Sequence, residues 1–455
     1  MTRTVVVGAG IAGLTAARRL VQQGRRVTVL EAAPQVGGKL RLAEVGGVQV
    51  DVGAEAMLNR RPEATGLARE LGLDLVHPGT LSSRLWTRDA LRPLPRSVMG
   101  VPADLEQLAA SGVLSDHGVA RARAEQVIAL EGDDVSVADF VARRLGVEVV
   151  DRLVEPLLGG VYAGHATELS ARATIPQVVA LLERSLSLLE AARATPTPSD
   201  VPVFAGLVGG VGRLPLELVA AGGFEVRTST TVRALRRVEG PEQTRFEVLV
   251  GPTTHPELIA ADEVVLAIPA TPAARLLGDL APNAASALAE IDYASMAIVT
   301  LAFRAADLVG LEGSGFLVPP VDGRRIKAAT FSFNKWDWVR EAGGGLLVLR
   351  TSIGRHHEEA SLQFADDELV AQSLADLALA TGISARPVDS LVQRWGGGLP
   401  QYTVGHLDRV SRIRAAVAQV PGLAVCGAAY DGIGIPAVIS SAERAVARLL
   451  HPDTP

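Results

Sequence analysis

The chain has 455 residues, 48% of them hydrophobic, and a formal net charge of −6 at pH 7. This length exceeds what one hydrophobic core usually supports, and the acidic balance argues against a general nucleic-acid-binding protein. The single cysteine, Cys426, excludes an internal disulfide and a cysteine zinc cluster, and no apolar run approaches the roughly 20 residues of a membrane span. We therefore expect several domains in a reducing cytoplasm and no transmembrane helix, with peripheral association at the inner face of a membrane left open.

The first 31 residues predict a dinucleotide site. Residues 5–7 are a β-branched run suited to a buried parallel strand, and Gly8, Gly10 and Gly13 follow with the spacing G-x-G-x-x-G. The first glycine permits a tight turn, the second lets a phosphate approach the backbone, and the third lets a helix pack on the strand. Unpaired N–H groups at the start of that helix favour a pyrophosphate. The residues assigned to it are Gly8, Ala9, Gly10, Ile11, Ala12 and Gly13.

Glu31 closes a second strand over 27–30 and is followed by Ala32. A carboxylate at this place accepts the ribose hydroxyls of an adenosine and repels a 2′-phosphate, which favours FAD or NAD over NADP. Gly38 and Lys39 then form part of a glycine turn that lets the chain wrap a longer cofactor, with Lys39 near its phosphates. This arrangement resembles the FAD proteins of the amine oxidase and phytoene desaturase superfamily, so we expect FAD.

An alternating segment over 46–59 ends in Gly53 and Ala54, followed by Glu55 and Ala56. Small residues at a strand end allow close backbone approach to a flat ring, and the resemblance implies that these four residues lie beside the isoalloxazine. We expect an amphipathic helix over 58–75, and then a hairpin built from 83–86 and 91–95 that leads into another domain.

Residues 97–199 are predicted to be almost wholly helical, with apolar residues at three and four spacing. The expected helices cover 105–108, 119–130, 137–145, 149–158 and 176–194. The connection over 159–164 reads Gly-Gly-Val-Tyr-Ala-Gly, and Glu-Leu-Ser follows at 168–170. This pattern resembles the oxygen-dependent porphyrinogen oxidases. The resemblance implies that Gly160, Ala163 and Gly164 expose carbonyl groups that accept from pyrrole N–H groups.

A proline-rich linker over 194–202 returns the chain to the cofactor domain. The resemblance implies a strand over 228–232 on the adenine side, with Val232 against the ring, and we expect further strands over 246–250 and 263–268. Four strands over 297–303, 315–318, 328–333 and 346–352, with a helix over 366–381, then predict a mostly antiparallel substrate domain. His356 and His357 are expected to diverge on a strand and to be exposed, so no metal site is predicted.

The last 60 residues return to the cofactor. Residues 394–406 resemble a porphyrinogen oxidase segment that ends in Pro-Gln-Tyr-x-x-Gly-His, and Trp395 is expected near the flavin. A strand over 423–426 leads through a glycine-rich turn to a closing helix, with Gly434 and Ile435 before Pro436 at its start. The resemblance implies that this helix start faces the pyrimidine end of the flavin, where its dipole favours the negative charge of the reduced ring.

The predicted fold class is α/β, or α+β with several domains: a Rossmann-like FAD-binding domain, an inserted helical domain and a mixed-sheet substrate-binding domain. The FAD-binding domain is expected over 1–80, 201–269 and 391–455, the helical domain over 81–200 and the substrate domain over 270–390. The resemblance, which runs from residue 1 to about 450, implies oxidation of coproporphyrinogen III with oxygen as acceptor, in haem biosynthesis. Arg84 is expected to pair with a propionate of this porphyrinogen, and the flavin, not a side chain, is expected to perform the chemistry.

Three alternatives stay open at this point. Protoporphyrinogen IX is the other substrate that the motifs fit. A carotenoid desaturase or an amine oxidase would share both chain ends, and a non-catalytic FAD-fold binding protein would share the fold alone. An iron-inserting enzyme could dock to collect the product.

Overall fold

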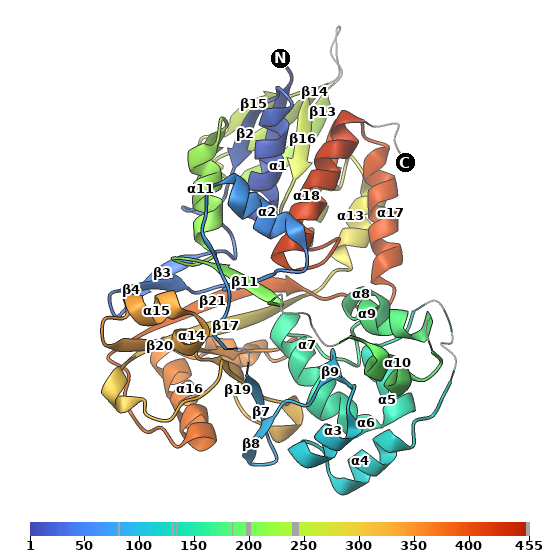
Figure 1. Ribbon diagram of the computed structural model, residues 1–455. Coiled ribbons are helices and arrows are strands. Elements are labelled where there is room, and N and C mark those ends of the chain that lie inside the picture. The colour runs from blue at the N-terminus through green and yellow to red at the C-terminus, as the bar shows by residue number, and fades with distance from the viewer. Residues whose placement is uncertain are drawn as a thin grey trace.

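The computed structural model describes residues 1–80, 82–128, 132, 134–183, 185–196, 202–238 and 245–451. Both ends of the chain lie in the same half of the molecule, on a layer of helices and parallel strands (Figure 1). A second sheet and a group of short helices fill the other half, side by side in Figure 1. The linker predicted over 194–202 lies largely outside the described residues, as does the end of the helix predicted over 119–130.

A five-stranded parallel sheet organises the half that holds the termini. Its strand order is β12 (Glu225–Arg227), β2 (Arg26–Leu30), β1 (Arg3–Val7), β16 (Glu263–Leu266) and β22 (Leu423–Val425). Helices α1 (Ile11–Gln22) and α18 (Ile435–Leu450) pack against each other on one face. Because the other face is covered as well, alternate residues of β1 enter two different cores, which explains its uninterrupted apolar sequence.

A seven-stranded sheet forms the second layer, with all its pairs antiparallel except β18 with β7. Its order is β21 (Asp389–Pro400), β17 (Tyr293–Arg304), β20 (Leu346–Ile353), β19 (Ile326–Thr330), β18 (Gly315–Leu317), β7 (Ser83–Thr87) and β8 (Ala90–Pro93). Helix α16 (Asp366–Thr381) covers one face through Leu369 and Leu377. The other face meets the short helices, where Leu85 and Leu317 join their core.

The short helices that lie in sequence between two parts of the first layer form the helical insert. They are α3 (Leu105–Ser111), α4 (Asp116–Arg123), α5 (Val137–Leu145), α6 (Val147–Val149), the π-helical turn η1 (Val150–Val154), α7 (Glu155–Val161), α8 (Ala171–Thr174), α9 (Pro176–Val179), the 3-10 turn η2 (Ala180–Glu183) and α10 (Leu188–Ala194). Serine side chains cap four of them, and the apolar faces of these helices close on one shared core.

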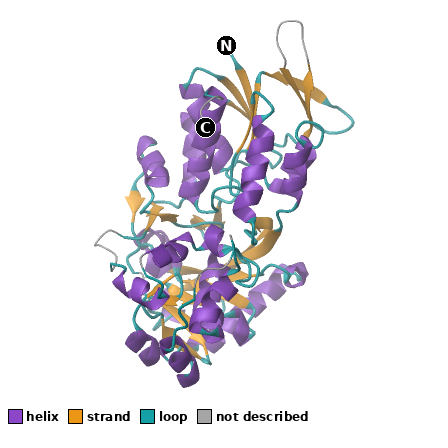
Figure 2. Cartoon of the chain, turned by 90° about the vertical axis from the view of Figure 1, so that its right-hand side faces the viewer, coloured by secondary structure: helices purple, strands orange, loops and turns teal. Residues whose placement is uncertain are grey.

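The other elements connect these layers. The strands are β3 (Leu42–Val45), β4 (Val48–Asp51), β5 (Met57–Leu58), β6 (Leu75–Val76), β9 (Ser97–Val98), β10 (Val101–Pro102), β11 (Phe204–Leu207), β13 (Val232–Val238), β14 (Arg245–Val250) and β15 (Glu257–Ala261). The helices are α2 (Pro62–Glu70), α11 (Arg213–Ala221), α12 (Ala270–Leu277), α13 (Pro282–Ala289), η3 (Ala305–Asp307), η4 (Pro320–Asp322), α14 (Ser332–Lys335), α15 (Asp337–Ala342), η5 (Glu359–Gln363) and α17 (His406–Ala418). Figure 2 shows the β13–β14–β15 sheet at the outer end of the first layer.

Several elements end earlier than the sequence predicted. Helix α4 stops at Arg123, and the helix predicted over 176–194 is broken into α9, η2 and α10. The strand predicted over 328–333 ends at Thr330 because α14 begins two residues later. Residues 228–231 form no strand; they follow β12 and precede β13.

The hairpin β7–β8 forms as predicted, but it pairs with β18 of the seven-stranded sheet, although the sequence grouped it with the helical insert. Strand β21 likewise belongs to this sheet, although it was grouped with the C-terminal part of the FAD-binding domain. Pairing between distant segments is invisible to local patterns, which explains both differences.

Candidate flavin and substrate site

The N-terminal glycine turn has the shape that a phosphate-binding loop needs. A Cβ atom at Gly13 would lie 1.8 Å from the Gly8 carbonyl oxygen, so only glycine lets α1 pack this closely on the turn. Gly8 has a φ of +101°, and a Cβ atom there would lie 2.6 Å from the Ala267 carbonyl oxygen. At Gly10, by contrast, no atom of a described residue other than Gly10 and its chain neighbours lies within 4 Å of the Cβ position. The turn is therefore tightly packed at Gly8 and Gly13 and open at Gly10.

The start of α1 offers free donors to this open side. Gly10 caps the helix without a side-chain hydrogen bond, and its first turn, which includes Ile11 and Ala12, carries no acidic residue. Backbone N–H groups without intrahelical partners attract an anion at such a helix start. The residues present thus fit the pyrophosphate of a dinucleotide.

The residues predicted for the adenosine half lie at the ends of β2 and β12. The two oxygens of Glu31 accept hydrogen bonds from the backbone N–H groups of Ala9, at 2.7 Å, and Ala33, at 2.8 Å. These bonds fix the carboxylate beside the glycine turn and Ala32. The Thr230 N–H donates to the Glu31 carbonyl at 2.8 Å, so the segment before Val232 runs along the same edge. Val232 is half-buried and packs against the core of the parallel sheet.

The second glycine turn lies directly on the first. The Gly37 N–H donates to the Ala9 carbonyl at 2.8 Å, and a Cβ atom at Gly38 would lie 3.4 Å from the Cα atom of Gly10. The side chain of Lys39 is accessible to solvent, yet surrounding protein lowers its pKa through desolvation. Lys39 therefore combines contact with solvent and desolvation by the protein around it.

Beyond Lys39 the chain reaches the place predicted for the isoalloxazine. A Cβ atom at Gly53 would lie 2.0 Å from the Lys39 carbonyl oxygen and 3.2 Å from the Trp395 ring, and the Ala54 N–H donates to that carbonyl at 3.2 Å. The Trp395 Nε1 donates to the Val52 carbonyl at 3.2 Å, which fixes the indole against this segment. The structure therefore brings Lys39, Gly53, Ala54 and Trp395 together.

Glu55 and Ala56 have other neighbours. The Glu55 carboxylate is buried and contacts Lys335 Nζ at 2.7 Å and Arg350 Nε at 3.1 Å. Burial alone would raise the pKa of Glu55, but the two cations outweigh it and hold the pKa at about 2. Ala56 packs on a small core between β4 and α15. The Glu55 side chain thus ties the predicted flavin segment to the seven-stranded sheet.

The C-terminal motif meets the N-terminal one. A Cβ atom at Gly427 would lie 3.9 Å from the Ala12 Cβ atom, and the Gly427 N–H donates to Ser441 in α18. Helix α18 begins at Ile435 after Gly434, with Pro436 in its first turn, no side-chain cap and no acidic residue there. A second uncapped helix start thus lies in the same region as the first.

The predicted substrate connection is only partly a loop. Gly160 lies inside α7, and a Cβ atom there would be 3.6 Å from Leu317. The carbonyl groups that follow already accept hydrogen bonds: Tyr162 from Gln401 Nε2 at 2.8 Å, and Ala163 from the His356 N–H at 2.7 Å. A Cβ atom at Gly164 would lie 2.0 Å from Gln401 Oε1. Two sheet segments therefore hold this connection, and each carbonyl keeps one lone pair.

Arg84 does not lie with this group. Successive side chains of β7 point to opposite faces, and Leu85 faces the helical insert together with Leu317. Arg84 shares the opposite face with Trp86, which belongs to the core under α16. Its Nη2 lies 3.7 Å from the exposed Glu312.

Two buried cations that the sequence analysis did not single out lie on the face toward the helical insert. Lys327 lies at a register shift in β19, and its Nζ donates to the Gly354 carbonyl at 2.9 Å. The same Nζ contacts Met296, whose neighbour Ala297 belongs to the opposite core. Its side chain is 2% exposed, and burial, with a smaller effect from Arg355, lowers its pKa to about 7. Arg355 is 3% exposed. A lysine in an otherwise apolar strand was the signal available in the sequence.

The expectation that the two adjacent histidines diverge on a strand is wrong, as is the expected exposure of His356, whereas His357 is exposed as predicted. They lie in a turn after β20, not on a strand, and their ring centroids are 3.9 Å apart. His356 is 5% exposed. Both rings direct a nitrogen atom toward Glu168, the first residue of the predicted Glu-Leu-Ser motif.

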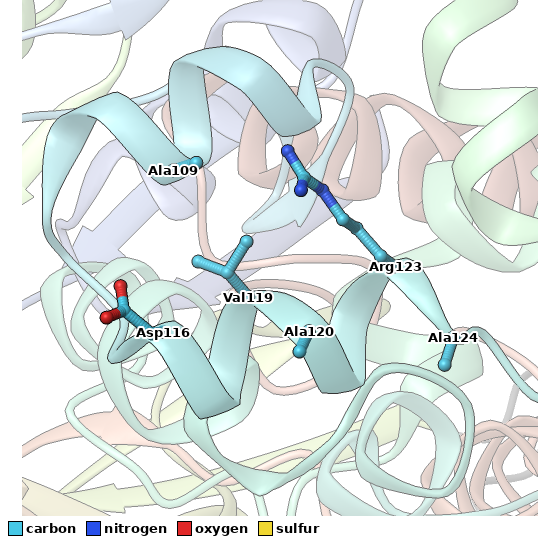
Figure 3. A pocket seen from close by; sticks show the side chains of 6 residues that line it. All are labelled: Ala109, Asp116, Val119, Ala120, Arg123 and Ala124. Carbon is cyan, nitrogen blue, oxygen red and sulfur yellow. The ribbon is translucent and has the colours of Figure 1, made fainter.

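A cavity of about 520 Å³ lies between α3 and α4 (Figure 3). Val119 and Arg123 line it, and Arg123 pairs with Glu106 at its edge. None of the residues predicted for cofactor or substrate is among its lining, so we assign it no part in the site.

Among the described residues, no helix is both long and apolar enough to cross a bilayer.

Comparisons with known proteins agree with this arrangement. The family model described as flavin containing amine oxidoreductase matches residues 11–450. A coproporphyrinogen III oxidase of Mycobacterium leprae is 40% identical over 98% of this chain and 97% of its own, and a protoporphyrinogen oxidase of Bos taurus is 30% identical over 99% of each. A crystal structure of a provisionally named protoporphyrinogen oxidase from Exiguobacterium sp. 255-15 superposes with a TM-score of 0.87, at 31% identity over 98% of each chain. The chain therefore belongs to the flavin-containing amine oxidoreductase family and is an FAD-dependent oxidoreductase.

Proposed function

We propose that this protein oxidises coproporphyrinogen III to coproporphyrin III, with oxygen as the final acceptor, in haem biosynthesis. The observation that supports it best is the connection over 162–164, held against the seven-stranded sheet on the side that also carries Trp395. The resemblance of this connection to porphyrinogen oxidases, and the name of the 40% identical mycobacterial relative, favour this substrate.

The residues of the chain have defined roles in this proposal. The two glycine turns and the start of α1 hold the pyrophosphate, Glu31 orients the adenosine ribose, and the start of α18 provides a positive dipole end at the flavin ring. FAD, when bound, accepts the two electrons of each step, which leave a meso carbon as hydride while a pyrrole nitrogen loses a proton. Three such steps transfer six electrons to three oxygen molecules and give three hydrogen peroxide molecules.

The carbonyl groups of Tyr162 and Ala163 are proposed to accept from the pyrrole N–H groups through their remaining lone pairs. This would hold the macrocycle with one meso carbon toward the flavin. Gly164 lets Gln401 approach the connection closely, and Gly160 faces Leu317 without a side chain of its own. Because Arg84 points to the opposite face of its strand, we propose the buried cations Lys327 and Arg355 as the nearer partners for propionate groups.

The test is oxidation of colourless coproporphyrinogen III in air by the purified yellow protein, followed by the fluorescence of the product. A rise that depends on bound FAD and consumes one oxygen per two electrons supports the proposal. A protein with full flavin content that produces no fluorescence from either porphyrinogen would contradict it.

Protoporphyrinogen IX is the second candidate, because the 30% identical bovine relative is named for it. Coproporphyrinogen carries four propionates and protoporphyrinogen two, so rates on both substrates, measured side by side, separate the candidates. A carotenoid desaturase or amine oxidase would turn over neither. A non-catalytic binding protein would retain no FAD on purification.

Docking of an iron-inserting enzyme and peripheral association with a membrane stay predictions. Transfer of coproporphyrin to the iron-inserting enzyme without release into solution tests the docking. Co-sedimentation of the protein with anionic vesicles tests the membrane association.

A further inference from the structure

We propose that Glu168, His356 and His357 bind one divalent transition metal ion, with zinc as the reference ion. The three residues come from two segments that are 188 positions apart in sequence. Glu168 follows α7 in the helical insert, and the histidines lie in the turn after β20. One carboxylate and two imidazoles are the ligand types that zinc takes in sites with an open fourth position.

The distances fit such a site. Nδ1 of His356 lies 3.2 Å from Oε2 of Glu168, and Nε2 of His357 lies 3.1 Å from Oε1 of the same carboxylate. Bonds of about 2.0 to 2.1 Å around a tetrahedral zinc ion separate neighbouring ligand atoms by about 3.3 Å. One ligand atom from each of the three residues lies within 4.8 Å of the others. Closing the site therefore needs only small side-chain movements.

The surroundings orient the ligands. His356 is anchored by its N–H to the Ala163 carbonyl, at 2.7 Å, while His165 Nε2 lies 2.9 Å from the His356 carbonyl oxygen. Both contacts fix the backbone of His356 and so restrict where its ring can lie. His357 has a φ of +68°, a conformation that turns its ring back toward His356. Its N–H contacts Glu359 at 3.2 Å.

Charge and access also suit a cation. The histidines are followed by Glu358 and Glu359; Glu358 pairs with Arg355 at 3.5 Å, so the cluster keeps negative charge from Glu168 and Glu359. The His357 side chain is 62% exposed, which leaves an entry path and room for water as the fourth ligand. The site is thus open on one side and fixed on the other.

The site lies between two parts of the protein that a bound metal ion would connect. A metal ion would link the helical insert to the seven-stranded sheet directly beside the connection over 162–164. Bound metal should stabilise the docking of these two parts and restrict this connection, so a zinc-dependent change in the substrate KM follows if the proposed function is correct. The metal site itself does not depend on that function.

The experiment is a zinc titration of the FAD-loaded protein, after treatment with a chelator and desalting, in competition with a chromophoric zinc indicator. We expect one zinc ion per chain. His357→Asn keeps a residue that tolerates positive φ and Glu168→Gln keeps the side-chain shape, and each should weaken zinc binding by about 10-fold to 100-fold. His255→Asn, which changes an exposed histidine outside the cluster, is the matched control and should bind like the unmodified protein.

An ion pair between protonated histidines and Glu168 would give the same contacts without a metal. In that case the unmodified protein and all three variants would bind zinc equally weakly, and this result would overturn the proposal. Flavin absorbance and circular dichroism check that each variant is folded. Because the readout is zinc stoichiometry, a failure here is distinct from a failure to oxidise porphyrinogens.

Discussion

The buried ammonium group of Lys327 allows a quantitative prediction about stability. Burial lowers its pKa from 10.5 to about 7 in the folded protein. A tenfold change in proton affinity corresponds to about 1.4 kcal/mol, so keeping this group charged inside the fold costs roughly 5 kcal/mol as an upper bound. Lys327→Met removes the charge and retains an unbranched side chain beside Met296. It also leaves the Gly354 carbonyl without its donor, at a cost of about 1–3 kcal/mol.

The two effects depend differently on pH. Because the folded-state pKa is the lower one, the unfolded chain binds more protons between about pH 7 and pH 10.5, and the stability of the unmodified protein rises with pH in this window. At pH 6.5 we therefore expect Lys327→Met to be more stable by about 2 kcal/mol. At pH 9.5 most of the charge penalty is gone, and the difference should fall to about zero.

Urea unfolding at both pH values, at one fixed FAD concentration, measures this difference. Lys335→Met is the matched control, because Lys335 pairs with Glu55 and its loss should destabilise the protein at both pH values. The reasoning is refuted if Lys327→Met is less stable at pH 6.5, or if its stability difference is the same at both pH values. Lower turnover of the more stable variant would show that the lysine is retained for activity.

Three further predictions follow from individual contacts. Gly13→Val should abolish FAD retention, since its Cβ atom would lie 1.8 Å from the Gly8 carbonyl oxygen; flavin absorbance after gel filtration measures this. Glu55→Gln should lower the free energy of unfolding by about 3–5 kcal/mol at pH 7. This difference between variant and unmodified protein should shrink as the pH falls from about 4.5 to 2, because Glu55 of the unmodified protein also becomes neutral there; unfolding midpoints across that range test it. Gly164→Ala should displace Gln401 and lower kcat/KM for porphyrinogen by up to about 100-fold with normal flavin content, which steady-state kinetics would reveal.

The shape of the N-terminal glycine turn was predictable from the sequence because its requirements are local. Gly8 and Gly13 are needed by backbone contacts within one turn and one helix, and spacing alone reports such contacts. The helix over 366–381 and the hairpin β7–β8 were confirmed for the same reason: each has a clear period and clear ends. The prediction for Arg84 depended on which face of β7 meets the helical insert. A period of two residues gives two such faces and does not distinguish them.

The cluster of Glu168 with His356 and His357 shows a different limit. Its members come from two segments far apart in sequence, and the expectation of divergent histidines assumed a strand where the chain forms a turn. The same turn supplies the N–H group that fixes the Ala163 carbonyl. Local patterns carried no sign of either contact.

These contacts divide the protein into two kinds of site. The proposed cofactor site is made largely of backbone from both chain ends, with the Glu31 carboxylate fixed beside the first glycine turn. The connection proposed to bind substrate is held from outside, by Gln401 at Tyr162 and by the turn of His356 at Ala163. Gln401 and His356 lie in the segments that follow β21 and β20 of the seven-stranded sheet. If this connection binds the substrate as proposed, variation in these two segments would change the substrate surface while the glycine turns of the cofactor site stay the same.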